Sequence, residues 1–300
     1  MTASARLAAF GLAAAIALGG GAALGAAAGP APAPAATVHS DHEDNPMPST
    51  ALAPTHASNS ASGENYRIHV ASTVVTAGEP QPLSFVVLDG AGEPVTQFED
   101  RHERPMHLIV VSNDLADYAH LHPELGAGGT WSAELPALDP GGYRVVADAV
   151  PAGGPDLVLT VDLVVPGVAA GRPLPEPTRI AVVDDLEVGL DLAPAADGLV
   201  AGLTVRRAGL VVEPEPYLGA RGHLVAIDAD DLAYLHVHPT DSDGPVSFAI
   251  ADPTPGRYRL FFDFSVDGQV RTAAFTVDIS ADTAGATGEG HAHAEGEGHR

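Results

Sequence analysis

The sequence contains no cysteine and only one tryptophan, and all 14 of its basic residues are arginine. Without thiols the protein has no disulfides, no thiolate metal ligands, no cysteine nucleophile and no cysteine for a lipoprotein anchor. Basic residues are few beside the 39 acidic ones, which gives a formal net charge of -25. A surface this negative repels phosphate backbones and attracts cations, so the composition argues against a nucleic-acid partner.

Long apolar runs are also scarce, and the longest lies at the N-terminus. Arg6 precedes an alanine-rich stretch over residues 7–24, and small residues follow it. This order is typical of a secretory signal peptide, and the run is weakly hydrophobic for a permanent membrane span. We therefore expect a signal peptide over residues 1–29, a secreted or cell-envelope protein, and no membrane span after signal cleavage. An uncleaved anchor is the alternative.

The remainder of the chain alternates between low-complexity and strand-like segments. Residues 30–64 are expected to form a disordered spacer, 166–178 a proline-rich linker, and 281–300 a His-rich disordered tail. Between them, short β-branched runs are separated by Gly, Pro and Asp. This spacing predicts an all-β protein with two tandem immunoglobulin-like β-sandwiches, over residues 65–165 and 179–280.

The two strand-rich regions are copies of each other. MHLIVVSNDLADYAHLHP (106–123) aligns without a gap with GHLVAIDADDLAYLHVHP (222–239), and PGGYRVVAD (140–148) aligns with PGRYRLFFD (255–263). Because the blocks recur in the same order at nearly the same spacing, we infer an internal duplication. The tyrosine after the glycine-containing turn of the second block resembles the tyrosine corner of immunoglobulin-type sandwiches. Tyr143 and Tyr258 would take that structural role.

Each copy carries three histidines at matching positions. They are His107, His120 and His122 in the first copy and His223, His236 and His238 in the second. Residues 106–122 predict a β-hairpin whose turn centres near residues 113–114. In a strand, alternate side chains share a face, so His120 and His122 project together, and this register places His107 opposite His120. Three imidazoles therefore gather on one face of two adjacent strands.

Such a set of imidazoles predicts a site for a divalent metal. Neutral imidazole nitrogens bind Zn²⁺ and Cu²⁺, and zinc sites commonly use three protein ligands plus water. The alternative is structural histidines that bond to backbone carbonyls. We favour metal because burying three unpaired imidazoles in each copy is costly. The first copy is the better copper candidate, because Met106 aligns with Gly222 and thioether sulfur suits Cu⁺.

Further histidines lie in the expected spacer and tail. They are His39, His42, His56, His291, His293 and His299. Histidine-rich low-complexity tracts either collect metal loosely or are solvated filler, and both readings stay open for these segments.

The string HERPMHLIVVSNDLADYAHLHPE (102–124), followed by PGGYRVVAD, resembles a group of poorly characterised bacterial exported proteins. These proteins carry immunoglobulin-like modules and are often labelled as heavy-metal or copper associated. The resemblance covers mainly residues 102–148 and, more loosely, 222–263. It implies a β-sandwich in the cell envelope with a role in metal handling, and it supplies no demonstrated activity.

Three functions follow from these features. The first is an exported metal-binding protein, for copper or zinc, that buffers or delivers a divalent ion through the repeated three-histidine site. The second is a non-catalytic structural or adhesive envelope protein with structural histidines and another envelope protein as its partner. The third is a zinc or copper enzyme, which needs a general base beside the metal. Only Asp114 and Asp230 recur near the histidines, and both lie in the expected turn, so we expect no enzyme.

Overall fold

The computed structural model describes residues 65–280 except 197, 236 and 241–244. All of the described residues belong to one compact unit. The expected signal peptide, spacer and tail lie outside the described residues, and so does His236. In the part that is described, no helix is long and apolar enough to cross a membrane.

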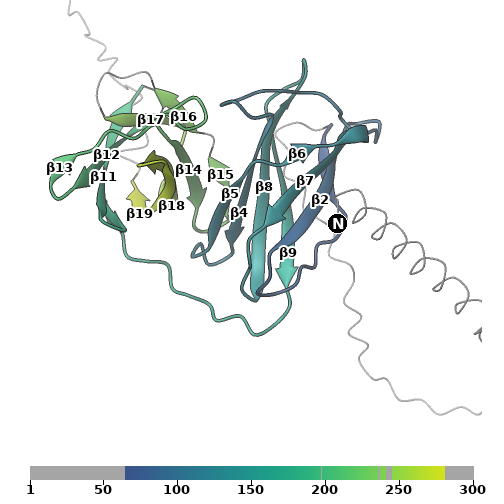
Figure 1. Ribbon diagram of the computed structural model, residues 1–300, viewed down its shortest axis with the longest axis horizontal. Coiled ribbons are helices and arrows are strands. Elements are labelled where there is room, and N and C mark those ends of the chain that lie inside the picture. Colours follow the sequence, from purple (N-terminus) through teal and green to yellow (C-terminus); the bar gives the residue numbers. More distant parts are fainter. Residues whose placement is uncertain (1–64, 197, 236, 241–244, 281–300) are drawn as a thin grey trace, which may run out of the picture. The chain divides into compact units, whose positions relative to one another are not determined.

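The predicted all-β fold with two tandem sandwiches is confirmed (Figure 1). In the first repeat one sheet has the order β1-β2-β7-β6, formed by Arg67–Val70, Gln81–Leu88, Thr130–Leu135 and Glu124–Leu125. The other has the order β3-β8-β4-β5 with β9 beside β8, formed by Phe98–Glu99, Gly141–Pro151, Met106–Ser112, Tyr118–Leu121 and Leu157–Val165. A single 3₁₀ turn, Ala127–Gly129, interrupts the strands of this repeat.

The second repeat has the same two-sheet construction. One sheet has the order β10-β11-β12-β17-β16 with β13 beside β12, formed by Ile180–Val183, Leu186–Ala195, Gly198–Arg207, Val246–Ala251, Val237–Thr240 and Leu210–Val211. The other has the order β15-β14-β18-β19, formed by Tyr234–Leu235, His223–Asp228, Gly256–Val266 and Gln269–Ile279. All the strand pairings within these sheets are antiparallel.

The burial pattern of β4 shows that its sheet is covered on both faces. An antiparallel strand on a sandwich surface normally alternates between buried and exposed residues. Strand β2 follows that rule, but all seven residues of β4 are buried. Leu108 and Val110 pack in the core of the first sandwich, whereas Ile109 and Val111 point the other way into a separate cluster.

That separate cluster is an apolar core between the two repeats. The first repeat contributes Ile109, Val111 and Val146, and the second contributes Val225, Ile227 and Phe261. The ring of Tyr118 stacks on that of Phe261 with centroids 4.0 Å apart. The sheet containing β4 and β8 therefore packs face to face on the sheet containing β14 and β18, and it is this face of β4 that carries His107.

Tyrosine corners are present in both repeats, as predicted. The Tyr143 hydroxyl donates to the carbonyl of Asp139 at 3.0 Å, and that of Tyr258 donates to the carbonyl of Thr254 at 2.9 Å. Both tyrosines are buried. Each bond closes the loop in front of β8 or β18.

The linker after the first repeat is fastened to the hairpin turn. Arg172 donates its backbone N–H to Asp114 at 3.0 Å and a guanidinium N–H to Asp117 at 2.9 Å. Leu174 packs against the apolar core between the repeats. The proline-rich segment therefore lies along the first repeat and is not a free spacer over these residues.

Candidate metal centre

Strands β4 and β5 form the predicted hairpin, but its predicted register was wrong. Ile109 pairs with His120 and Leu108 with Leu121, so the position opposite His107 is 122 and not 120. The turn is centred one step later than expected, between Asp114 and Leu115. Its geometry explains the shift, because Leu115 adopts a left-handed φ of 57° and the Ser112 amide closes the turn on the carbonyl of Asp117. All three histidines nevertheless share one face.

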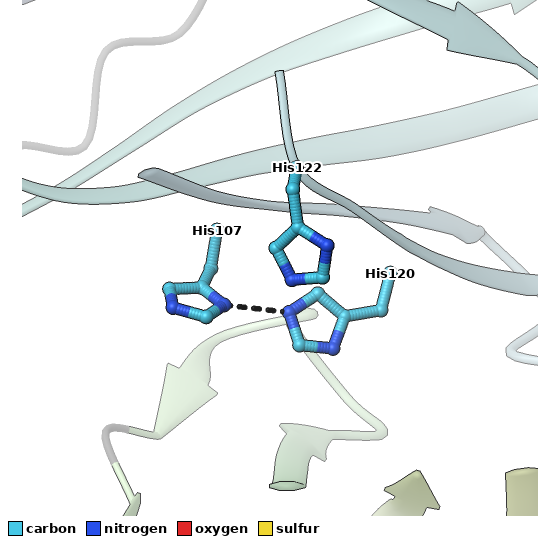
Figure 2. A group of neighbouring side chains, drawn as sticks. All are labelled: His107, His120 and His122. Atoms are coloured by element: carbon cyan, nitrogen blue, oxygen red, sulfur yellow. Dashed lines mark hydrogen bonds between the residues drawn. The ribbon is translucent and has the colours of Figure 1, made fainter. Parts of the chain in front are cut away.

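The three histidines of the first repeat form a compact cluster on the face that packs against the second repeat (Figure 2). One ring nitrogen of each of His107, His120 and His122 lies within 4.8 Å of the others. The ring centroids are 4.8 to 5.1 Å apart. His107 is 9% exposed, and the His120 side chain is 7% exposed. The rings are therefore close enough to act on one ligand and are largely shielded from water.

Hydrogen bonds assign the proton on two of these rings. Nε2 of His107 lies 3.0 Å from the carbonyl oxygen of Arg101, and Nδ1 of His120 lies 2.9 Å from a carboxylate oxygen of Asp263. Both oxygens accept only, so these two nitrogens carry the protons. The remaining nitrogens, Nδ1 of His107 and Nε2 of His120, then carry lone pairs and face each other at 2.9 Å (Figure 2). Two acceptors at this distance require a proton or a cation between them.

Burial disfavours a proton on His107. The pKa of His107 is lowered to about 4, mainly by desolvation and also by its interaction with His120, and the bond to the Arg101 carbonyl opposes this shift. Desolvation also lowers the pKa of His122 to about 3, with help from His120 and His107. At neutral pH His107 and His122 are therefore uncharged, which is the form that binds metal ions.

His122 supplies the third nitrogen. Its Nε2 atom is buried and has no hydrogen-bond partner among the described residues. A buried nitrogen without a partner costs roughly 1–3 kcal/mol, and a metal bond would remove that cost. Zinc or copper bound at 2.0–2.1 Å separates tetrahedral imidazole nitrogens by about 3.3 Å, so side-chain movements of about 1 Å would complete the site. The donor set therefore fits a divalent ion.

The matching histidines of the second repeat are arranged differently. His223 lies on β14 and bonds through Nε2 to the carbonyl of Tyr217 at 3.1 Å, as His107 bonds to Arg101. Burial lowers its pKa to about 4. His238 is exposed on β16, which belongs to the other sheet of that repeat, and His236 lies outside the described residues. Within the described part of the chain, only the first repeat assembles three histidines.

His223 instead adjoins the histidine cluster of the first repeat. Its ring centroid is 5.7 Å from that of His107 and 5.8 Å from that of His120. His102, from the loop before β4, lies 5.3 Å from His223 by the same measure. The sequence predicts separate sites in the two copies, whereas the packing of β4 against β14 brings histidines of both copies together.

Asp263 is the site residue that the sequence analysis missed. Its side chain is 5% exposed, and it reaches His120 from the other repeat. A carboxylate on a metal-binding histidine fixes the ring orientation and its tautomer. The sequence did contain a signal for this residue. Each of the two aligned blocks, PGGYRVVAD and PGRYRLFFD, ends in an aspartate directly after an apolar run, Asp148 in the first and Asp263 in the second.

A small cavity of about 70 Å³ lies beside the cluster. Its lining includes His102, His107, His120, His223 and the apolar side chains of Ile109 and Val225. A cavity needs roughly 10–15 Å³ to hold one water, so this space suits a few waters or a bound ion better than an organic substrate.

A family model described as "Domain of unknown function (DUF8832)" matches residues 60–166 and 181–281. The two matches cover more than half of the chain, so the chain belongs to this family and contains its domain twice. That description includes no copper or heavy-metal association. No curated protein matches the sequence.

Several solved structures resemble the fold. Salmonella alpha-2-macroglobulin is 16% identical with a TM-score of 0.26, and the match covers 78% of this chain and 16% of that one. The Escherichia coli adhesin FdeC is 14% identical with a TM-score of 0.27, covering 74% and 66%. Surface layer protein SbsC is 12% identical with a TM-score of 0.21, covering 75% and 32%. This chain thus spans less than two thirds of each of these structures, and the likeness concerns the fold alone.

Proposed function

We propose that this protein is an exported metal-binding protein that holds a divalent copper or zinc ion through His107, His120 and His122. One observation carries the proposal: Nδ1 of His107 and Nε2 of His120 lie 2.9 Å apart, near a buried Nε2 atom of His122 that has no hydrogen-bond partner in the described part of the chain. Three imidazole ligands suit Zn²⁺ and Cu²⁺, and they leave a coordination position for water or a transfer partner.

The rest of the chain supports buffering or delivery over catalysis. A net charge of -25 attracts cations to the surface, and the lack of cysteine leaves no thiol to oxidise outside the cytoplasm. A catalytic metal site needs a general base near the ion. Asp114 recurs in both copies, but it binds Arg172 and the turn residue Ser112 at the hairpin end. We therefore propose no enzymatic activity.

Metal titration of the purified chain tests the proposal. The histidines of the N-terminal and C-terminal low-complexity segments are first replaced by alanine, so that only those of the sandwiches remain. Calorimetry with Zn²⁺ and with Cu²⁺ should then show binding, and the double substitution H120A/H122A should abolish it. Replacing His69, which is exposed on β1, provides the control and should leave binding unchanged. Absence of binding in the parent chain would refute the metal-binding proposal.

The second candidate is a structural or adhesive envelope protein, in which the histidines act only as hydrogen-bonding groups. The observation that favours it is the bond from His120 to Asp263, a direct contact between side chains of the two repeats. Neighbours of similar fold include an adhesin and a surface layer protein, although this likeness extends to the fold alone. Elemental analysis of protein from the native host separates the candidates, because the structural role requires no copper or zinc.

A further inference from the structure

The carboxylate of Asp263 is a junction between the two repeats. Its Oδ2 atom accepts from Nδ1 of His120 and from the hydroxyl of Tyr118, both at 2.9 Å. Its Oδ1 atom accepts from the hydroxyl of Thr272, a neighbour within the second repeat. The carboxylate is thereby held in place by its own repeat on one side and by the first repeat on the other.

The position of Asp263 follows from the strand register. Asp263 pairs with His223 across β18 and β14, and directly opposite residues of an antiparallel pair share a face. That face is the one packed on the first repeat. Asp148 occupies the matching place in the first repeat, pairs with His107, and accepts from the hydroxyl of Tyr234 at 2.9 Å. Each repeat therefore offers an aspartate to the tyrosine of the other.

Asp263 contacts a member of the three-histidine cluster by a hydrogen bond, and it belongs to the opposite repeat. The bond directs the Nε2 lone pair of His120 toward the nitrogen of His107. If His120 lost this acceptor, its proton could move to Nε2 and the lone pair would leave the cluster. The binding geometry of the first repeat thus depends on a residue of the second.

We infer that the metal site is a clamp between the repeats, in which Asp263 is the positioning residue for His120 and ion binding requires the two repeats to be docked. The inference rests on the proposed function and adds that metal binding is coupled to the docking of the two repeats. By linkage, an ion that binds only the docked arrangement stabilises that arrangement. Carboxylate partners of metal-binding histidines typically contribute 10- to 100-fold in affinity.

Zn²⁺ calorimetry on the full chain, with the histidines of its two terminal segments replaced, tests the clamp with two matched variants. Asp263→Asn removes the charge and allows an amide N–H to face His120, so the dissociation constant should rise about 10- to 100-fold. Tyr118→Phe removes the other bond to the same carboxylate oxygen but keeps the ring on Phe261, so the affinity should change less than about threefold. Equal affinities for the parent and Asp263→Asn would overturn the clamp and leave the metal-binding proposal intact.

The site of protonation on the His120 ring distinguishes a positioning role of Asp263 from a purely structural one. Nitrogen-15 NMR should find the neutral His120 ring protonated on Nδ1 in the metal-free parent and in Tyr118→Phe, and on Nε2 in Asp263→Asn. Where Asp263→Asn does not fold, Asp263→Glu decides, since it keeps the charge and displaces it by one methylene; we expect about a tenfold loss in affinity. Unchanged binding by Asp263→Glu would also overturn the inference, and no binding by the parent would refute the proposed function itself.

Discussion

His120 of the first repeat and Asp263 of the second are joined by a 2.9 Å bond between Nδ1 and Oδ2, although 143 residues separate them in the chain. Both side chains are almost fully buried. The bond connects the candidate metal site to the packing of the repeats, so substitutions at the site and at the repeat interface are expected to have distinguishable effects.

Replacing His122 by alanine should remove metal-dependent stabilisation while changing the metal-free protein little. Its buried Nε2 atom has no partner among the described residues, so the metal-free state loses no hydrogen bond there. In the parent, Zn²⁺ at a hundredfold excess over its dissociation constant should add about 2.7 kcal/mol to the free energy of unfolding. Thermal melts with and without chelator measure this, with His69→Ala as the control. Equal metal-induced shifts in both variants would contradict the assignment.

The metal-free protein should lose stability as the pH falls from about 6.5 to 4. Burial lowers the pKa values of His107 and His223 to about 4 in the folded state, whereas the unfolded chain binds these protons near 6.5. Below 6.5 the unfolded state therefore holds more protons, and each such histidine lowers the free energy of unfolding by up to about 1.4 kcal/mol per pH unit. The contribution of these two histidines levels off below about pH 4, whereas that of His122, whose pKa is about 3, continues to fall below that value.

Urea unfolding across this pH range, in chelator, measures the effect. Replacing both His107 and His223 by glutamine should flatten the slope between pH 6.5 and 4. A slope that is unchanged by the double substitution would assign the pH dependence to other groups.

The reciprocal tyrosines should contribute similarly to stability. Tyr118 donates to Asp263 and Tyr234 donates to Asp148, each at 2.9 Å and each in a buried setting. A hydrogen bond to a charged group contributes about 1.5–3 kcal/mol. Denaturant titration should therefore show a loss of that size for Tyr118→Phe and for Tyr234→Phe. A loss of stability in only one of the two variants would show that the two tyrosine–aspartate bonds contribute unequally.

Phe261→Ala should uncouple the repeats. Its side chain lies in the apolar core between them and stacks on Tyr118. Truncating a buried phenylalanine costs about 3–5 kcal/mol, and here the cavity forms between the repeats and not within one. Calorimetric melting should separate into two transitions. Phe248→Ala, which lies in the internal core of the second repeat, is the matched control and should lower stability without removing the coupling.

Arg172→Ala should release the linker with little change in melting temperature. Its ion pairs with Asp114 and Asp117 are solvent-exposed, and exposed pairs contribute little to global stability. Limited proteolysis should cleave the variant faster within residues 166–178 than the parent. Arg179→Ala, an exposed arginine just after the linker, is the control. Equal cleavage rates in the variant and the parent would mean that these ion pairs do not hold the linker in place.

The fold was largely predictable because its determinants are local. β-Branched runs, Gly and Pro breaks and the repeated blocks predicted two sandwiches, and the tyrosines after the glycine turns predicted the corners that Tyr143 and Tyr258 form. The register of the hairpin could not be predicted from such local patterns. It depends on how Ser112, Asp114 and Leu115 close the turn, and a shift of one pair changes which residue lies opposite His107.

The spacing in the sequence was enough to place His120 and His122 on one face, because side-chain alternation along a strand depends only on spacing. That His107 shares this face depends on the register of the hairpin. The packing of the two repeats buries this face, brings His223 beside His107, and places Asp263 to accept a hydrogen bond from Nδ1 of His120. The physical reason is that burial and partner choice are set by packing between sheets remote in the chain. Those contacts lower the histidine pKa values and align the lone pairs, which no local pattern encodes.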